Sequence, residues 1–327
     1  MTNLYLTDYA SDDVVKTPIR KGFGEGLRNA GEKNTDVVAL CADLTESTQM
    51  YLFKEAFPER FFEVGVAEQN LVTVGSGLAA MGKIPFVSSY AAFSPGRNWE
   101  QIRTTVALND RPVKIIGSHA GIYTGADGAT HQMLEDIALM RVMPNMVIIA
   151  PGDAVEAEKA TRALAEDNRP GYLRLAREAT PVFTTARTPF EIGKAYLLRE
   201  GKAISLIATG TMTHKALMAA RQLAQDGIEA DVLHVPTVKP LDAVAVLKTA
   251  SKTGLIITIE EAQINGGLGG AISELLSEHQ PTHIFRMGMN DRFGESGKPD
   301  ELFEYFGLTA KHIYLKAHAA LTELKKI

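Results

Sequence analysis

Residues 113–140 read VKIIGSHAGIYTGADGATHQMLEDIALM, and this stretch decides the fold prediction. Its first part, Val113–Ile116, is a short apolar run bounded by proline and glycine, which is typical of a buried strand. From Met133 onward, apolar residues recur at helical spacing. The loop between strand and helix is rich in glycine and carries two histidines and an aspartate. Because open α/β sheets place their ligand sites at the carboxyl ends of strands, this loop is expected to carry out chemistry.

The same alternation of strand-like and helix-like patterns runs along the whole chain. It predicts an α/β fold with two domains, each a mostly parallel sheet covered by helices. In the first half, the expected strands are 37–42, 86–90, 113–118, 146–150 and 172–175, and the expected helices are 19–30, 66–81, 98–108, 133–140 and 154–166. In the second half, the expected strands are 203–208, 232–235, 255–259 and 284–287, and the expected helices are 213–225, 242–249 and 268–278. Residues 180–188 are interpreted as a linker, so the predicted domains span residues 1–185 and 190–327.

Composition excludes several classes of function. The chain has 327 residues and a net charge of −5, without a basic tract interleaved with aromatics, so no nucleic-acid partner is expected. Its apolar stretches reach only about eight residues, which is too short to span a bilayer. Met1–Asp13 lacks the basic-then-apolar order of a secretory signal. The single cysteine, Cys41, excludes an intrachain disulfide and a multi-cysteine metal site, and we expect a cytoplasmic protein.

The glycine-rich loop holds the first candidate site residues, His119, Asp127 and His131. The spacing of the histidines matches no zinc signature and no thiolate is near, so we predict no metal ligands here. Two imidazoles and a carboxylate on one loop favour hydrogen bonding and proton transfer to a polar substrate over a structural role.

Glu68 is the second candidate, at the start of a predicted helix. The helix continues as Val74-Gly75-Ser76-Gly77-Leu78-Ala79-Ala80, and each glycine in it costs roughly 1 kcal/mol relative to alanine. So many small residues indicate that something packs closely against this helix. For Glu68 itself two interpretations stay open, a functional role and favourable placement near a helix N-terminus.

Aromatic and cationic residues near element ends complete the candidates. Tyr90 and Phe93, three apart after a predicted strand, are suited to form a wall for a flat ring or to plug the top of the core. Arginine suits phosphate, although each such arginine also fits a surface ion pair. The polar candidates of this kind are Arg20, Ser47, Arg97, Arg103 and Arg177.

Together these motifs resemble the second half of a transketolase, over nearly the whole chain. The motifs that carry the resemblance are Ala42-Asp43-Leu44-Thr45, Val64-Gly65-Val66-Ala67-Glu68-Gln69, Gly125-Ala126-Asp127-Gly128-Ala129-Thr130-His131-Gln132, Leu175-Ala176-Arg177 and Asp291-Arg292-Phe293-Gly294-Glu295-Ser296-Gly297. The Asp-Gly-x-Thr-His-Gln loop is the most specific of them. The resemblance implies a pyrimidine-binding domain followed by a C-terminal domain. It also implies thiamine diphosphate as cofactor and the transfer of a two-carbon ketol unit between sugar phosphates.

The resemblance further implies a cofactor-binding role for several residues. Glu68 would hydrogen-bond a ring nitrogen of the aminopyrimidine and so promote removal of the proton from the thiazolium carbon. Tyr90 and Phe93 would pack on the pyrimidine, and Asp43 and Leu44 would lie beside it.

Substrate contacts follow from the same resemblance. His119, His131 and Asp127 would hold sugar hydroxyls and move protons while carbon–carbon bonds break and form. Arg20, Ser47, Arg177 and Arg97 would bind the substrate, the first three at its phosphate. Near Arg97 the sequence departs from the family pattern, because a third aromatic is replaced around Gly96.

A larger departure concerns the diphosphate. A full transketolase opens with a domain in which a Gly-Asp-Gly motif and a later asparagine hold the diphosphate through Mg²⁺. Asp127-Gly128 and Asn290-Asp291 have the wrong spacing for this, and a hard cation needs several oxygen ligands. We therefore expect the metal ligands on a partner, an N-terminal diphosphate-binding transketolase subunit. The expected assembly is a heterotetramer of two plus two, with the small-residue helix after Glu68 at an interface.

Three alternatives remain. Half of a 1-deoxyxylulose 5-phosphate synthase-like enzyme would share the main motifs, but such enzymes usually carry an arginine in place of His119. A 2-oxoacid dehydrogenase beta-type subunit has a similar length but typically lacks this loop. A non-catalytic scaffold of the same fold would need none of the residues Glu68, His119, Asp127 and His131.

Overall fold

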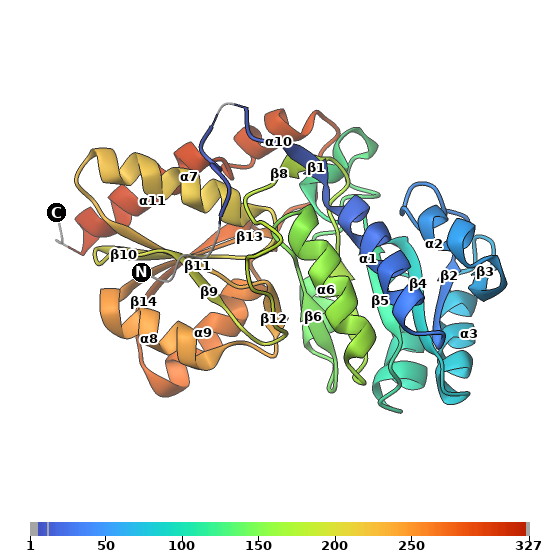
Figure 1. The fold of residues 1–327 in the computed structure, drawn as a ribbon. Coiled ribbons are helices and arrows are strands. Elements are labelled where there is room, and N and C mark those ends of the chain that lie inside the picture. Colours follow the sequence, from blue (N-terminus) through green and yellow to red (C-terminus); the bar gives the residue numbers. More distant parts are fainter. Residues whose placement is uncertain (1–5, 12, 325–327) are drawn as a thin grey trace.

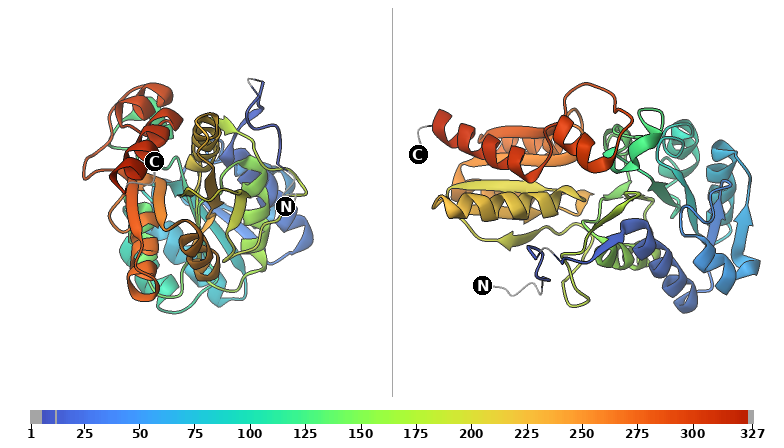
Figure 2. Two further views of the ribbon diagram at one scale, coloured as in Figure 1. Left: turned by 90° about the vertical axis from the view of Figure 1, so that its left-hand side faces the viewer. Right: turned by 90° about the horizontal axis from the view of Figure 1, so that it is seen from above.

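The computed structural model describes residues 6–11 and 13–324, which form two lobes side by side (Figures 1 and 2). The first lobe holds the blue-to-green part of the chain and the second the yellow-to-red part. The sequence prediction for Met1–Asp13 falls in part, at positions 1–5 and 12, outside the described residues.

A seven-stranded sheet forms the first lobe, in the order β12-β6-β7-β5-β4-β2-β3. All neighbouring strands in it are parallel except β12, which pairs antiparallel with β6 at the edge. The strands are β2 (Val37–Cys41), β3 (Phe61–Glu63), β4 (Ile84–Tyr90), β5 (Lys114–Ser118), β6 (Val147–Ile149), β7 (Gly171–Arg174) and β12 (Thr237–Lys239). Every residue of β2 is buried, as expected for a central strand of a sheet covered on both faces.

Helices cover both faces of this sheet. Val37, Ala39 and Cys41 face the core formed with α1 (Ile19–Lys33) and α6 (Ala154–Glu166). The alternate residues of β2 face the opposite core, which contains side chains from α3 (Glu68–Ala80), α5 (Asp136–Arg141), α4 (Trp99–Gln101) and the π-helical turn η2 (Ile102–Ala107). This period of two is the pattern expected of a strand buried on both sides.

The second lobe is built on a five-stranded sheet in the order β14-β13-β10-β11-β9. Only β9 runs antiparallel to its neighbour. The strands are β9 (Tyr196–Arg199), β10 (Ile204–Ala208), β11 (Ala230–His234), β13 (Leu255–Gln263) and β14 (His283–Met289). Figure 1 shows α7 (Met212–Gln225) and α11 (Ala310–Glu323) on one face, and α8 (Ala243–Thr253) and α9 (Leu268–His279) on the other. The predicted fold class is therefore confirmed.

The second half of the chain contributes one strand to the sheet of the first lobe. Strand β12 comes from the second half of the chain but lies in the first sheet. The predicted linker at 180–188 begins inside β8 (Ala179–Pro181), which pairs antiparallel with β1 (Lys16–Pro18), and Phe183 beyond it is fully buried. The linker is thus packed against the lobes, and the domain boundaries at 185 and 190 stay predictions.

One predicted helix begins later than expected. The sequence predicts a helix over 133–140, but α5 begins at Asp136. Met133 instead forms a parallel bridge with Ala120, and its carbonyl accepts the Gly121 N–H at 2.9 Å. This bridge ties the two ends of the glycine-rich loop together, which prevents Met133 from joining the helix.

Several short elements were not predicted, because three to seven residues give too little periodicity. They are α2 (Tyr51–Ala56), the 3-10 turns η1 (Pro58–Arg60) and η3 (Ile122–Asp127), and α10 (Pro299–Tyr305), besides β1, β3, β8, β9 and β12; the longer α11 was not predicted either. Of these, α10 lies directly against η3. Across residues 6–11 and 13–324, no helix has the length and apolarity needed to cross a bilayer.

Candidate active site

The register between β4 and β5 creates the centre of the candidate site. Tyr90, the last residue of β4, is the register partner of Ser118, the last residue of β5. The ring of Tyr90 consequently stacks on the imidazole of the next residue, His119, with centroids 3.8 Å apart and planes 27° apart. Two residues that lie far apart in sequence thus meet at the carboxyl ends of neighbouring strands, where the sequence predicted a ligand site.

His119 is buried and held in an unusual backbone conformation. Its φ is +56°, and its carbonyl accepts the Thr124 hydroxyl at 2.6 Å. The Ser118 hydroxyl lies 2.9 Å from Nδ1. Burial, reinforced by the charges of Arg20 and Arg177, lowers the pKa of His119 to about 3. The imidazole is therefore neutral at physiological pH and available for hydrogen bonding.

His131 joins the cluster from the other end of the loop. Its ring lies edge-on to Phe93, with centroids 5.3 Å apart, and its Nδ1 is 2.8 Å from the Thr130 hydroxyl. Phe93 and Tyr90 are nearly parallel, with centroids 6.2 Å apart and planes 25° apart. Four predicted site residues, the two histidines and the two aromatics, are thus brought together.

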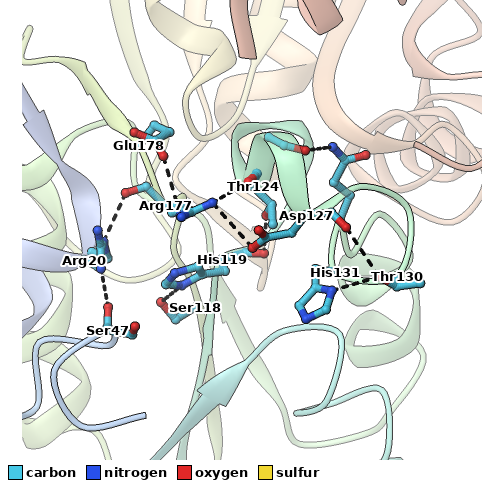
Figure 3. Close-up of polar contacts among 12 residues, drawn as sticks. Arg20, Ser47, Ser118, His119, Thr124, Asp127, Thr130, His131, Arg177 and Glu178 are labelled. Carbon is cyan, nitrogen blue, oxygen red and sulfur yellow. Dashed lines mark hydrogen bonds and ion pairs between the residues drawn. The ribbon is translucent and has the colours of Figure 1, made fainter. Parts of the chain in front are cut away.

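Arg177 connects this cluster to the predicted phosphate-binding residues (Figure 3). Its Nη1 donates to the Thr124 carbonyl at 2.9 Å and lies 3.4 Å from the Asp127 carboxylate. Its own carbonyl accepts a 3.1 Å hydrogen bond from Arg20 Nε, and Arg20 Nη1 donates to the Ser47 carbonyl. Four separate segments of the chain therefore meet around two guanidinium groups.

Among the described residues, no carboxylate lies within ion-pair distance of Arg20, although Glu178 attracts its charge from further away. Both of its hydrogen bonds go to carbonyl oxygens. Burial lowers its pKa, and the nearby Arg177 lowers it further. Two guanidinium groups in such proximity repel one another, so an anion placed between them would be stabilised.

Glu68 lies apart from this anion site, at the first position of α3. It is only 2% exposed, and its carbonyl accepts a 2.9 Å hydrogen bond from the Asn98 side chain. Arg97 Nη1 donates to Glu68 Oε2 at 2.8 Å, while its guanidinium lies 4.7 Å from the centroid of Phe93. The structure thus places Arg97, a predicted substrate-binding residue, with Glu68 and not beside the predicted phosphate-binding residues Arg20 and Arg177.

Asp43 and Leu44 lie on the loop that follows β2. Asp43 is exposed with φ +59°, and its backbone N–H donates to Glu63 Oε1 at 2.7 Å. The same carboxylate accepts the Thr45 hydroxyl at 3.0 Å and the Gly65 N–H at 3.1 Å. Glu63 therefore shapes the loop that carries both predicted cofactor-binding residues.

Within the described residues, no group of three or more His, Cys, Asp or Glu side chains is arranged to hold a metal ion.

Comparison with known proteins gives consistent matches along the chain. The profile described as "Transketolase, pyrimidine binding domain" matches residues 16–182, and that of "Transketolase, C-terminal domain" matches residues 193–313. The chain belongs to the transketolase family. It is 44% identical over 311 residues to a "Putative transketolase C-terminal section" of Methanocaldococcus jannaschii, covering 94% of this chain and 96% of that protein.

Two further transketolase-family relatives extend this picture. The 6-deoxy-6-sulfo-D-fructose transketolase subunit SqwH of Clostridium sp. is 42% identical over 307 residues, or 94% of this chain and 95% of that protein. A solved structure, "Split gene transketolase, inactive beta4 tetramer", superposes with a TM-score of 0.88 at 43% identity, covering 93% of this chain and 98% of that one. This transketolase-family chain is thus similar over nearly its full length to a transketolase C-terminal section, a transketolase subunit and a split gene transketolase.

The structure adds residues that sequence reasoning missed. Glu63 holds the loop of Asp43 and Leu44, Asn98 bonds the Glu68 carbonyl, and Thr124 holds His119. Glu63 directly precedes the quoted motif around Glu68, so its position beside that motif was a usable signal. For Asn98 and Thr124 no pattern in a transketolase-like sequence marks the contact, because each depends on a loop closing back on itself.

Proposed function

We propose that this chain is the C-terminal subunit of a two-chain transketolase, which transfers a two-carbon ketol unit between sugar phosphates with thiamine diphosphate. The observation that carries the proposal is the pair of guanidinium groups, Arg20 and Arg177, held over the loop of His119. The pair offers an anion site next to hydrogen-bonding imidazoles and a carboxylate, the arrangement a phosphorylated polyol needs.

The surroundings of Glu68 fit the flat heterocycle of thiamine diphosphate. Arg97 occupies Oε2 of the buried carboxylate, and Oε1 accepts no hydrogen bond from the described residues. The neighbouring Asn98 Oδ1 is buried and also unpartnered among them. Tyr90 and Phe93 offer ring faces nearby, with Asp43 and Leu44 on the adjoining loop. When bound, this cofactor supplies the electron sink for carbon–carbon cleavage.

Each polar residue of the loop has a distinct role in this proposal. Neutral His119 donates or accepts a hydrogen bond at a sugar oxygen without adding charge, and the more exposed His131 holds a proton at the substrate. Asp127 binds hydroxyl groups and orients Arg177 through their 3.4 Å contact. Arg20, Ser47 and Arg177 bind the phosphate.

A partner completes the site in this proposal. Glu68, Tyr90 and Phe93 offer contacts for the heterocycle, whereas Mg²⁺ and the diphosphate need oxygen ligands that we assign to an N-terminal diphosphate-binding subunit. Support comes from the relatives named as C-terminal sections or subunits. We propose that the assembly is a heterotetramer of two chains of each kind. We also propose a cytoplasmic location, because the single cysteine is buried and free.

The decisive experiment assays the chain alone and mixed with the N-terminal subunit. Both samples receive thiamine diphosphate, Mg²⁺, xylulose 5-phosphate and ribose 5-phosphate. The expected result is turnover only in the mixture. Turnover by this chain alone would contradict the two-chain proposal. Cofactor binding in the mixture without turnover of any sugar would identify a scaffold.

Two further substrate pairs test the anion and the reaction class. Pyruvate with glyceraldehyde 3-phosphate as the productive pair would select the synthase-like alternative. The Clostridium relative is named for 6-deoxy-6-sulfo-D-fructose, so this donor is compared with fructose 6-phosphate. We expect the phosphate to be preferred, since a dianion gains more from two guanidinium groups than a sulfonate does.

A further inference from the structure

A buried carboxylate from the second lobe reaches the catalytic loop of the first. Glu261 lies near the end of β13 and is 3% exposed. Its Oε1 accepts the backbone N–H of Tyr123 at 2.8 Å, and its Oε2 accepts the Thr211 hydroxyl at 2.6 Å. Oε1 therefore bonds the first lobe, while Oε2 is held by Thr211 in the lobe of Glu261 itself.

The loop is shaped to receive this carboxylate at Gly121. The φ of Gly121 is +78°, and a Cβ atom built on it would lie 2.3 Å from Glu261 Oε1 and 3.0 Å from Arg174 Nη2. A side chain at this position would both strain the backbone and displace the carboxylate. Glu261 and Gly121 thus fit together as a pair, one from each lobe.

The backbone around Glu261 is fixed as well. Its carbonyl accepts Arg174 Nη2 at 2.7 Å, and Arg174 Nε donates to Asp136 at 2.9 Å. Two residues further along β13, the Gln263 N–H donates to the Leu134 carbonyl at 2.8 Å. Strand β13 is therefore bonded to Arg174 of β7 and to Leu134 just beyond the end of the glycine-rich loop, and the Glu261 side chain holds Tyr123 within the loop.

Tyr123 transmits this support to the site residues. It lies in the η3 turn between His119 and Asp127. The next residue, Thr124, donates its hydroxyl to the His119 carbonyl at 2.6 Å and accepts Arg177 Nη1 on its own carbonyl at 2.9 Å. A shift of the Tyr123 amide would therefore displace both His119 and Arg177.

We propose that Glu261 is a positioning residue, through which the C-terminal domain sets the geometry of the substrate-binding loop. The inference rests on the proposed function for what the loop binds, but the contact between the lobes is independent of it. The C-terminal domain then takes part in substrate binding and is more than an assembly module.

The first test measures the loop itself. Hydrogen exchange of the peptide covering residues 119–132 is followed by mass spectrometry in the isolated chain and in the two-subunit complex. We expect Glu261→Ala to speed exchange in this peptide by about tenfold or more, because the Tyr123 N–H loses its acceptor. Glu156→Ala is the matched control. Glu156 is a similarly buried carboxylate that bonds His234 across the lobes at a distance of 2.8 Å, and this contact lies away from the loop.

The second test separates positioning from general stability. In the complex, Glu261→Ala should raise the KM for ribose 5-phosphate about tenfold while the Kd for thiamine diphosphate stays within about twofold. Glu261→Gln should recover most of the loss, because its amide oxygen still accepts the Tyr123 N–H. Gly121→Ala perturbs the same contact from the loop side. If Glu261→Ala does not fold, hydrogen exchange and KM are measured on Gly121→Ala instead.

Unchanged exchange in residues 119–132 for both Glu261→Ala and Gly121→Ala would overturn the inference. Inactivity of the wild-type complex with sugar phosphates would count against the proposed function alone, since the exchange measurement needs no substrate.

Discussion

Arg97 donates a 2.8 Å hydrogen bond to Glu68, so a half-exposed guanidinium is bonded to a carboxylate that is almost fully buried. The bond occupies Oε2, and the described residues give Oε1 no hydrogen-bond donor. In the proposed function this open oxygen bonds the ligand, and Arg97 fixes the orientation of the carboxylate.

Removing Arg97 should therefore destabilise the isolated chain. Arg97→Met leaves the Glu68 charge buried without its partner, and we expect a loss of about 1–3 kcal/mol in the free energy of unfolding. Urea denaturation measures it. Arg103→Met is the control, an exposed arginine without an ion pair among the described residues. Equal midpoints for the two variants would show that Arg97 does not stabilise Glu68.

Glu68→Gln should remove activity without disturbing assembly. The amide keeps the shape of the carboxylate but loses its charge, so we expect ketol transfer by the complex to fall by about 100-fold or more. Deuterium exchange at the thiazolium carbon, followed by NMR, locates the defect, and sedimentation checks assembly. Glu278→Gln, on the exposed face of α9, is the control. Near-normal proton exchange in Glu68→Gln would remove Glu68 from its proposed role.

Arg20 and Arg177 should determine affinity for phosphorylated substrates. A charge-assisted hydrogen bond contributes about 1.5–3 kcal/mol, so Arg177→Ala should raise the KM for xylulose 5-phosphate about 10- to 100-fold. A donor without phosphate, such as hydroxypyruvate, should be unaffected. Arg199→Ala, which breaks a 2.7 Å surface ion pair with Glu229, is the control. An equal loss with both donors would contradict phosphate binding.

Local patterns were sufficient to predict much of this architecture. The apolar run Val113–Ile116 lies within or beside β5, and the polar loop after it does hold His119, Asp127 and His131. Such features are encoded within one segment, because a buried strand needs a continuous apolar run and a ligand loop needs glycine and polar side chains.

Contacts between distant segments could not be predicted in this way. Arg20 bonds the Arg177 carbonyl 157 residues away, and neither residue's neighbours indicate it. Strand β13 was expected to end at Ile259, where the apolar pattern stops, but it continues to Gln263 because Glu260 and Glu261 find buried partners. In both cases polar groups are satisfied by tertiary partners that sequence periodicity does not register.

His119 should make the free energy of unfolding depend on pH. Its pKa is about 3 in the folded chain and near 6.5 when unfolded, so the unfolded state binds more protons between these values. Stability is full above pH 6.5 and falls as the pH drops below it, by at most about 1.4 kcal/mol per pH unit from this residue. Urea unfolding at pH 7, 6 and 5 should show a smaller decline for His119→Asn than for the wild type. Parallel declines would refute the low pKa.

The two glycines of α3 should respond in opposite ways to substitution. A Cβ on Gly75 would lie 2.7 Å from Val87 Cγ1 of β4, whereas one on Gly77 would meet nothing within 4 Å. Gly75→Ala should therefore destabilise the isolated chain, and Gly77→Ala should stabilise it by up to about 1 kcal/mol through helix propensity.

Packing within this chain therefore explains why residue 75 is a glycine, but it does not explain why residue 77 is one. If Gly77 is small because α3 docks on the N-terminal subunit, Gly77→Trp should leave the isolated chain folded but abolish association in sedimentation experiments. Lys248→Trp, on a helix of the other lobe, controls for the added aromatic surface. Normal association of Gly77→Trp would move the partner interface away from this helix, because an indole cannot fit between two closely packed backbones.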